Sequence, residues 1–98
     1  MIHYNFLKLT QAADAEAVLA RCREVYAELE AELDFLHDAK VSRCITVRDS
    51  NADIMMVMQL DGPEYLNDYL KHPKHLALVN DMKDYVMDRM SFDEKEAC

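Results

Sequence analysis

The spacing of apolar residues changes its period several times along the 98 residues, and the order of these changes limits the folds that the chain can adopt. Residues 2–9 (IHYNFLKL) alternate as a β-strand does. One face of this strand would carry Tyr4 and Phe6, and the other would carry His3, Asn5 and Leu7. From Asp14, a residue type that caps helices, apolar residues recur at steps of three and four. The stripe predicts one long helix and consists of Val18, Cys22, Val25, Leu29, Leu33 and Leu36.

Two more strands follow this helix and should form a hairpin. Residues 40–49 (KVSRCITVRD) are rich in β-branched side chains, which favour a strand. The turn-forming segment DSNAD then leads into a third strand over residues 54–60. Residues 61–63 (DGP) end that strand and begin a short helix.

Pro73 divides the C-terminal third of the chain, because proline ends one helix and serves as the first residue of another. His72 is the predicted N-cap of the second helix. Its apolar stripe should contain Leu76, Val79, Met82 and Val86. A last strand is predicted over residues 89–93. We treat His72 as structural, since its place before a proline suits a cap and turn residue.

The order of these elements, βαββαβ, predicts a ferredoxin-like α+β fold with a four-stranded antiparallel sheet and the helices on one face. The whole chain, 1–98, would form one domain with a disordered tail over 94–98. The sheet would leave an apolar face without cover, formed by Tyr4, Phe6, Ile54, Met56, Met58 and Leu60. Burying apolar area contributes roughly 25 cal/mol per Å². We therefore expect a homodimer, in which two sheets pair face to face into a dimeric α+β barrel.

Composition excludes several functional classes. The net charge of −8, without a cluster of lysine or arginine, argues against binding nucleic acid or an anionic membrane. No apolar run is long enough for a membrane span, so we expect a soluble, cytoplasmic protein. The three cysteines lack metal-type spacing, which favours reduced thiols, and Cys22 and Cys44 are predicted to lie in the core.

The segment YLKHPKHLALVNDMKDYVMDRMSFD, together with the first strand, resembles the stress-responsive A/B barrel (Dabb) family of dimeric α/β barrel proteins. The resemblance spans essentially the whole chain and rests on Tyr69, His72, Pro73, His75, Asp88, Arg89 and Asp93. One departure is the segment LDFLHDAK, which replaces the Pro-Gly common in the family between the first helix and the second strand. The resemblance implies the dimeric fold predicted above.

The family includes a polyketide cyclase, and matched positions imply a site. His75 would be the general base, Tyr69 its partner, and His3 a pocket residue. Independently, a neutral imidazole beside a phenol can enolise a carbonyl compound without a cofactor, and a helix N-terminus disfavours the imidazolium form. The predicted ligand contacts are Asn5, Leu7, Tyr26, Asp53 and Met55, where Asp53 takes the place of a further pocket histidine.

Three functions remain open. The protein could be a cofactor-free acid/base enzyme acting on a small carbonyl compound, a non-catalytic binder of a small organic ligand, or a stable dimeric stress protein. A cavity beside His75 would favour the first two, and a filled site the third. No metal is expected, because the spacing of His72 and His75 is not a zinc pattern, even with His3 added.

Overall fold

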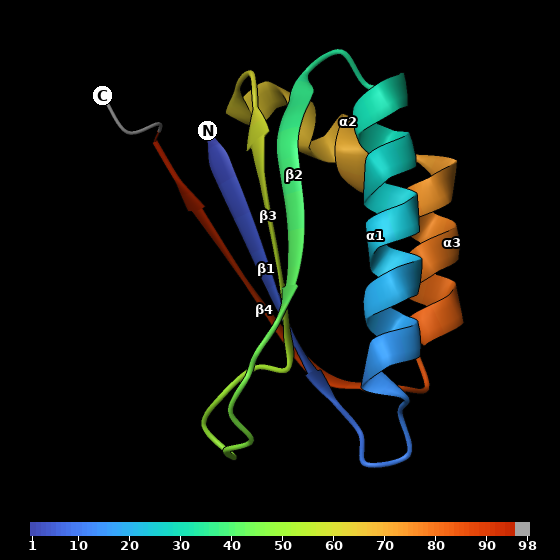
Figure 1. The fold of residues 1–98 in the computed structure, drawn as a ribbon. Helices are drawn as coiled ribbons and strands as arrows, with labels where there is room; N and C mark the ends of the chain where they lie inside the picture. The colour runs from blue at the N-terminus through green and yellow to red at the C-terminus, as the bar shows by residue number, and fades with distance from the viewer. Residues whose placement is uncertain (96–98) are drawn as a thin grey trace.

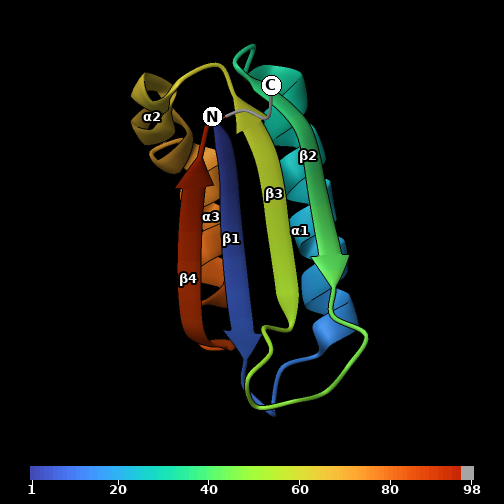
Figure 2. The same cartoon turned by 90° about the vertical axis from the view of Figure 1, so that its left-hand side faces the viewer.

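The computed structural model describes residues 1–95, which form a four-stranded antiparallel sheet with the helices on one face (Figure 1). The elements are β1 (Ile2–Leu9), α1 (Ala15–Glu32), β2 (Leu36–Arg43), β3 (Ile54–Leu60), the 3-10 turn η1 (Pro63–Tyr65), α2 (Leu66–Leu70), α3 (Pro73–Met82) and β4 (Val86–Glu94). The strand order is β2-β3-β1-β4 (Figure 2). The predicted ferredoxin-like βαββαβ fold is therefore confirmed.

Both predicted helix caps are present. The Asp14 carboxylate accepts a hydrogen bond of 3.2 Å from the Ala17 N–H, and His72 Nδ1 accepts one of 3.1 Å from the Lys74 N–H. Each cap satisfies a donor that the first helical turn leaves unpaired. Glu94, which was assigned to the predicted tail over 94–98, belongs to β4, and residues 96–98 lie outside the described part.

The apolar face of α3 is rotated relative to the prediction. The helix buries His75, Leu78 and Met82, whereas Leu76 is 54% exposed. Four consecutive residues, 76–79, are apolar, so periodicity alone does not decide which of them face the sheet. Packing against the sheet makes that choice, and it brings His75 inward.

The second strand lies earlier than predicted, at residues 36–43 instead of 40–49. The predicted strand end is a loop, in which Ile45 and Val47 are 98% and 99% exposed. Cys44 is also exposed, contrary to its predicted place in the core, while Cys22 is buried as predicted. Strand propensity fails here because these β-branched residues have no partner strand. The loop is instead held by Lys8, whose amine donates to the backbone carbonyls of Arg48 and Asn51.

The prediction of which face of β3 lies at the dimer interface is wrong. In the antiparallel pair β1–β3, His3 lies opposite Met58, Asn5 opposite Met56, and Leu7 opposite Ile54. Ile54, Met56, Met58 and Leu60 therefore point toward the helices, where they are buried. Because β3 is apolar on both faces, its sequence does not reveal which side turns inward, and the pairing register decides.

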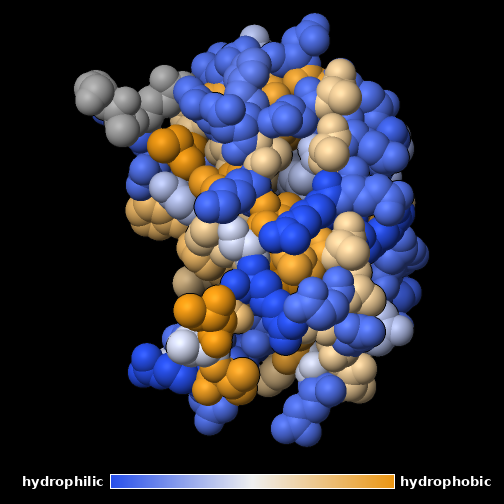
Figure 3. All heavy atoms as spheres, in the orientation of Figure 1, coloured by the Kyte–Doolittle hydropathy of each residue, from blue (hydrophilic) through white to orange (hydrophobic). Residues whose placement is uncertain are grey.

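The face of the sheet opposite the helices is apolar, but the residues that form it differ from the predicted ones. This open face carries Tyr4, Phe6, Met55, Val57, Met90 and Phe92. Met90 and Phe92 are 70% and 57% exposed. Apolar side chains gather along the sheet side on the left of Figure 3, and hydrophilic ones cover the helices on the right.

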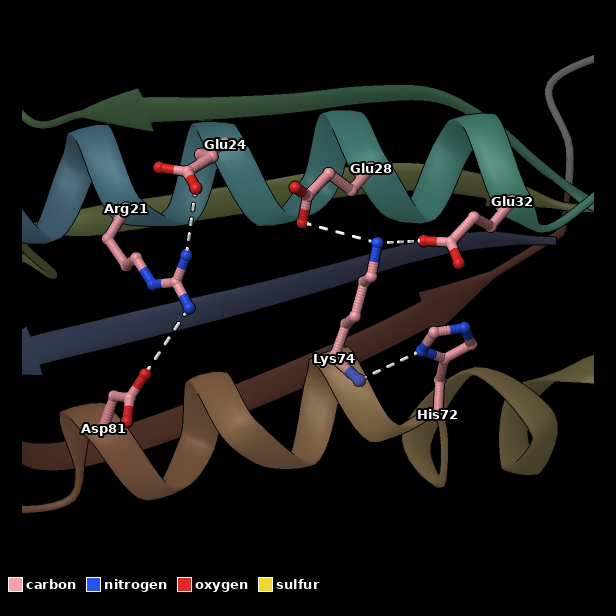
Figure 4. A network of polar contacts seen from close by, with 7 residues as sticks. All are labelled: Arg21, Glu24, Glu28, Glu32, His72, Lys74 and Asp81. Carbon is pink, nitrogen blue, oxygen red and sulfur yellow. Dashed lines mark hydrogen bonds and ion pairs between the residues drawn. The ribbon is translucent and has the colours of Figure 1, made fainter.

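Polar contacts on the surface join α3 to α1 (Figure 4). The Lys74 amine pairs with Glu28 and Glu32 of α1, and Arg21 pairs with Asp81 of α3. Exposed pairs of this kind contribute little stability singly, but this network spans both ends of the contact between the helices. No helix within residues 1–95 combines the length and the apolar character that a membrane crossing needs.

Candidate functional site

His3, Tyr69 and His75 meet between the sheet and the helices, from β1, α2 and α3. The Tyr69 ring centroid lies 4.7 Å from that of His75 and 5.7 Å from that of His3. Tyr69 is fully buried, and His3 and His75 are 4% and 7% exposed. The three residues predicted as catalytic are therefore neighbours, with the tyrosine ring between the two imidazoles.

The orientation of His75 follows from the helix break before it. Helix α2 ends at Leu70, whose carbonyl lies 2.9 Å from His75 Nδ1. A carbonyl oxygen only accepts, so Nδ1 carries the proton and donates it. In the neutral ring, Nε2 is then the basic nitrogen. Burial lowers the pKa of His75, the bond to Leu70 partly opposes this, and the charge of Arg89 adds to the lowering.

His3 is held in the same way by a residue to which the sequence reasoning gave no catalytic role. His3 and Asp93 are directly opposite each other on β1 and β4, and His3 Nδ1 lies 2.5 Å from the Asp93 carboxylate. A carboxylate at this distance fixes the Nδ1–H tautomer and leaves Nε2 as the basic nitrogen. Only the β1–β4 register identifies the partner, which is why periodicity did not reveal it.

The second nitrogens of both rings reach the protein surface. Among the residues that the structure describes, Thr10 Oγ1 is the only buried side-chain nitrogen or oxygen without a hydrogen-bond partner. Nε2 of His3 and of His75 make no hydrogen bond within the described chain, yet they are not sealed in the core. Both bases are thus oriented by a hydrogen bond at Nδ1, and their Nε2 atoms make no hydrogen bond within the described residues.

The Tyr69 hydroxyl is directed toward α1. It lies 2.5 Å from the hydroxyl of Tyr26, which is 2% exposed. Burial raises the pKa of both phenols, that of Tyr26 to about 12. Both therefore stay neutral near pH 7, and each satisfies the other in an apolar environment.

Only some of the predicted ligand-contact residues lie on the same side of the sheet as the histidine cluster. Asn5 and Leu7 face the helices on β1, although Leu7 is a fully buried core residue. Met55 faces the opposite side of the sheet, so it does not line this site. The Asp53 carboxylate accepts a 2.7 Å hydrogen bond from the Leu9 N–H. This places Asp53 at the far end of β1 from His3, where it orders the strand end.

Two hollows of about 350 Å³ lie outside the cluster. One is on the open face beneath the 44–53 loop, beside Lys8 and Met90. The other, between α3 and β4, is lined by Val79, Lys83, Val86, Met87, Asp88 and Arg89. His3, Tyr69 and His75 line neither of these two hollows.

Comparisons with known proteins agree with this architecture. Among solved structures, a dimeric protein of unknown function with a ferredoxin-like fold from Bacteroides fragilis NCTC 9343 aligns with a TM-score of 0.83 at 17% identity, covering 97% of this chain and 94% of that one. A dimeric ferredoxin-like protein from Jannaschia sp. CCS1 aligns with a TM-score of 0.80 at 13% identity, covering 97% of each chain. A Dabb family protein from Mesorhizobium loti aligns with a TM-score of 0.66 at 15% identity, covering 99% and 96%.

At these identities the solved structures show the fold alone. A search of curated proteins found no match. The scan of protein families matches residues 2–96 to the Stress Responsive A/B Barrel Domain. The match spans every helix and strand of the structure, and the chain therefore belongs to the Dabb family, the stress-responsive A/B barrel domain proteins.

Proposed function

We propose that this Dabb protein moves a proton on a small carbonyl compound without a cofactor, using His75 and His3 as its bases. The observation that carries the proposal is the fixed tautomer of His75. The Leu70 carbonyl holds the proton on Nδ1, and the basic Nε2 makes no hydrogen bond within the described chain. A lowered pKa keeps that nitrogen free to accept a proton near neutral pH.

The two histidines suit different parts of such a reaction. His75 has only neutral partners, so it is the better candidate to remove a proton from carbon. His3 is paired with Asp93, whose carboxylate holds the proton on Nδ1 and orients Nε2. The oriented Nε2 of His3 is thus the better candidate to pass a proton to oxygen. Tyr69 does not serve as the oxyanion donor in this scheme, since its hydroxyl is engaged with Tyr26; it positions the two rings.

The same proposal includes a homodimer. The open face of the sheet exposes Met90 and Phe92 beside Tyr4 and Phe6, an apolar surface that a second sheet would cover. Two structural neighbours with this fold are described as dimeric. The 44–53 loop, which lines a hollow on this face and exposes Ile45 and Val47, would add to the contact. The cluster lies on the other side of the sheet, so each protomer would hold a complete set of residues.

Exchange of carbon-bound protons tests the catalytic part. Phenylpyruvate and ethyl acetoacetate, incubated in D₂O, should lose their α-proton signals in ¹H NMR faster with the protein than without it. His75→Gln should reduce this acceleration by about 10²-fold or more, the usual size of a general-base contribution. His37→Gln is the matched control, because His37 is exposed on β2 and, within residues 1–95, its side chain pairs only with Asp61. Equal rates for the unmodified protein and the His75 variant would reject the proposal.

A second candidate function is a non-catalytic dimeric stress protein in which the cluster is structural. The observation that favours it is the complete burial of Tyr69, which lines neither of the two hollows described above. In that case His75→Gln should lower the melting temperature, and no carbonyl compound should bind. The exchange assay and a thermal melt of the same variant separate the two functions.

A further inference from the structure

The hollow between α3 and β4 differs in charge from the rest of the protein. Lys83 at the end of α3 and Arg89 on β4 contribute two positive charges to its lining, and Asp88 contributes one negative charge. The hollow thus has a local excess of one positive charge, in a chain whose net charge is −8. Its remaining walls, Val79, Val86 and Met87, are apolar.

The cations of this hollow are not used by the fold. Within residues 1–95, neither Lys83 nor Arg89 has an ion-pair or hydrogen-bond partner for its side chain, whereas Arg21, Arg43 and Lys74 all pair with carboxylates. The neighbouring carboxylate of Asp88 accepts a bond from the Arg89 backbone N–H at 2.9 Å. A guanidinium that lines a hollow without a protein partner can bind a carboxylate with two parallel hydrogen bonds.

The hollow is also next to the histidine cluster. His75 and Val79 are four residues apart on α3, so they lie on the same face in successive turns. Arg89 lies opposite Leu7 in the β1–β4 pair, on the face of the sheet that also carries His3. Its positive charge adds to the lowering that burial causes in the pKa of His75, and it opposes the larger rise that burial causes in the pKa of Tyr26 and Tyr69.

We infer that the hollow between α3 and β4 is a carboxylate-binding subsite, in which Arg89 and Lys83 hold the anionic end of a small ligand whose other end reaches His75. This inference rests on the proposed function and names its substrate class: small oxo-carboxylic acids with an apolar portion. The carboxylate pairs with the cations, and the apolar portion contacts Val79, Val86 and Met87. A neutral ketone of the same shape lacks the first of these interactions.

Phenylpyruvate and its uncharged methyl ester are a matched pair of probes. Calorimetric titration should show that the full-length protein binds phenylpyruvate at least about tenfold more tightly than the ester, the effect expected of one charge-assisted pair. Arg89→Gln should remove this difference by weakening phenylpyruvate binding alone, and Lys83→Gln should weaken it less. Arg48→Gln is the control, since Arg48 lies on the 44–53 loop and does not line the hollow. Added salt should weaken binding of the acid more than of the ester.

The results distinguish this inference from the proposed function. If phenylpyruvate binds through Arg89 but the protein does not speed its proton exchange, the subsite is supported and the catalytic proposal fails. If the protein exchanges the protons of the acid and of the ester equally well, with equal affinity for both, catalysis is supported and the subsite is refuted. No binding of phenylpyruvate, or binding that Arg89→Gln leaves unchanged, would also overturn the inference.

Discussion

The pair of buried hydroxyls on Tyr26 and Tyr69 offers a quantitative test of how the cluster is held. Each phenol is the other's only side-chain hydrogen-bond partner within the described residues, at 2.5 Å, and the two residues are 2% and 0% exposed. Tyr26→Phe removes one hydroxyl and leaves the other buried without a partner. An unsatisfied buried hydroxyl costs roughly 1–3 kcal/mol. Tyr69→Phe should cost a similar amount for the same reason.

The double variant is the decisive one. With both hydroxyls replaced by hydrogen, no buried polar group remains unpaired, and the ring packing is kept. The double variant should therefore lose much less stability than the sum of the single losses, with a coupling free energy of about 1–3 kcal/mol. In a chain of this size, each kcal/mol corresponds to a shift of about 4–8 °C in melting temperature.

Urea unfolding followed by circular dichroism measures all four proteins. The protein concentration must be the same throughout, because a dimer gains apparent stability with concentration. Losses that add within about 0.5 kcal/mol would refute the pairing. So would a single variant that is as stable as the unmodified protein, since no buried hydroxyl would then have lost its partner.

Three further predictions concern single positions. Burial lowers the pKa of His75 in the folded state, so below about pH 6.5 the unfolded state binds more protons than the folded state does. The free energy of unfolding should therefore fall as the pH decreases from about 6.5 through the folded-state pKa. Urea unfolding of His75→Gln should show a weaker fall. Met55→Glu, on the open face, should give a folded monomer in light scattering. Met56→Glu, in the core, should instead lower the free energy of unfolding by several kcal/mol. A folded dimer of Met55→Glu would contradict the proposed interface. Thiol labelling followed by mass spectrometry should modify Cys44 much faster than Cys22. Side-chain and backbone hydrogen bonds with Thr46 lower the pKa of the exposed Cys44, whereas burial raises that of Cys22 to about 11; equal rates would contradict these environments.

The cluster could be partly predicted because its members occupy positions with a local signature. Pro73 ends one helix and begins another, and this break alone places His72 at a cap and His75 in the first turn. Alternation along residues 2–9 places His3 on the side opposite Tyr4 and Phe6. The family resemblance then joined His3 and His75 with Tyr69, and in the structure the Tyr69 ring centroid lies within 6 Å of that of each imidazole.

The hydrogen bonds that orient the site could not be predicted in the same way. Asp93 meets His3 only because β4 pairs with β1 in one register, and a shift of one residue would turn its side chain to the other face. Tyr26 and Tyr69 are 43 residues apart and meet through the packing of α1 against α2. No local pattern carries information about contacts at such a separation.

The sequence by itself determined the order of the helices and strands, the two helix caps and the inward side of β1, since each depends on interactions between residues close in the chain. The tertiary structure alone decided which face of β3 is buried, where β2 ends and which side of α3 turns inward. These segments are apolar on more than one side, so their local free energies are similar for either choice. Pairing with β1 and packing between the layers select one arrangement. The same selection sets Asp93 beside His3 and Arg89 in the hollow next to His75.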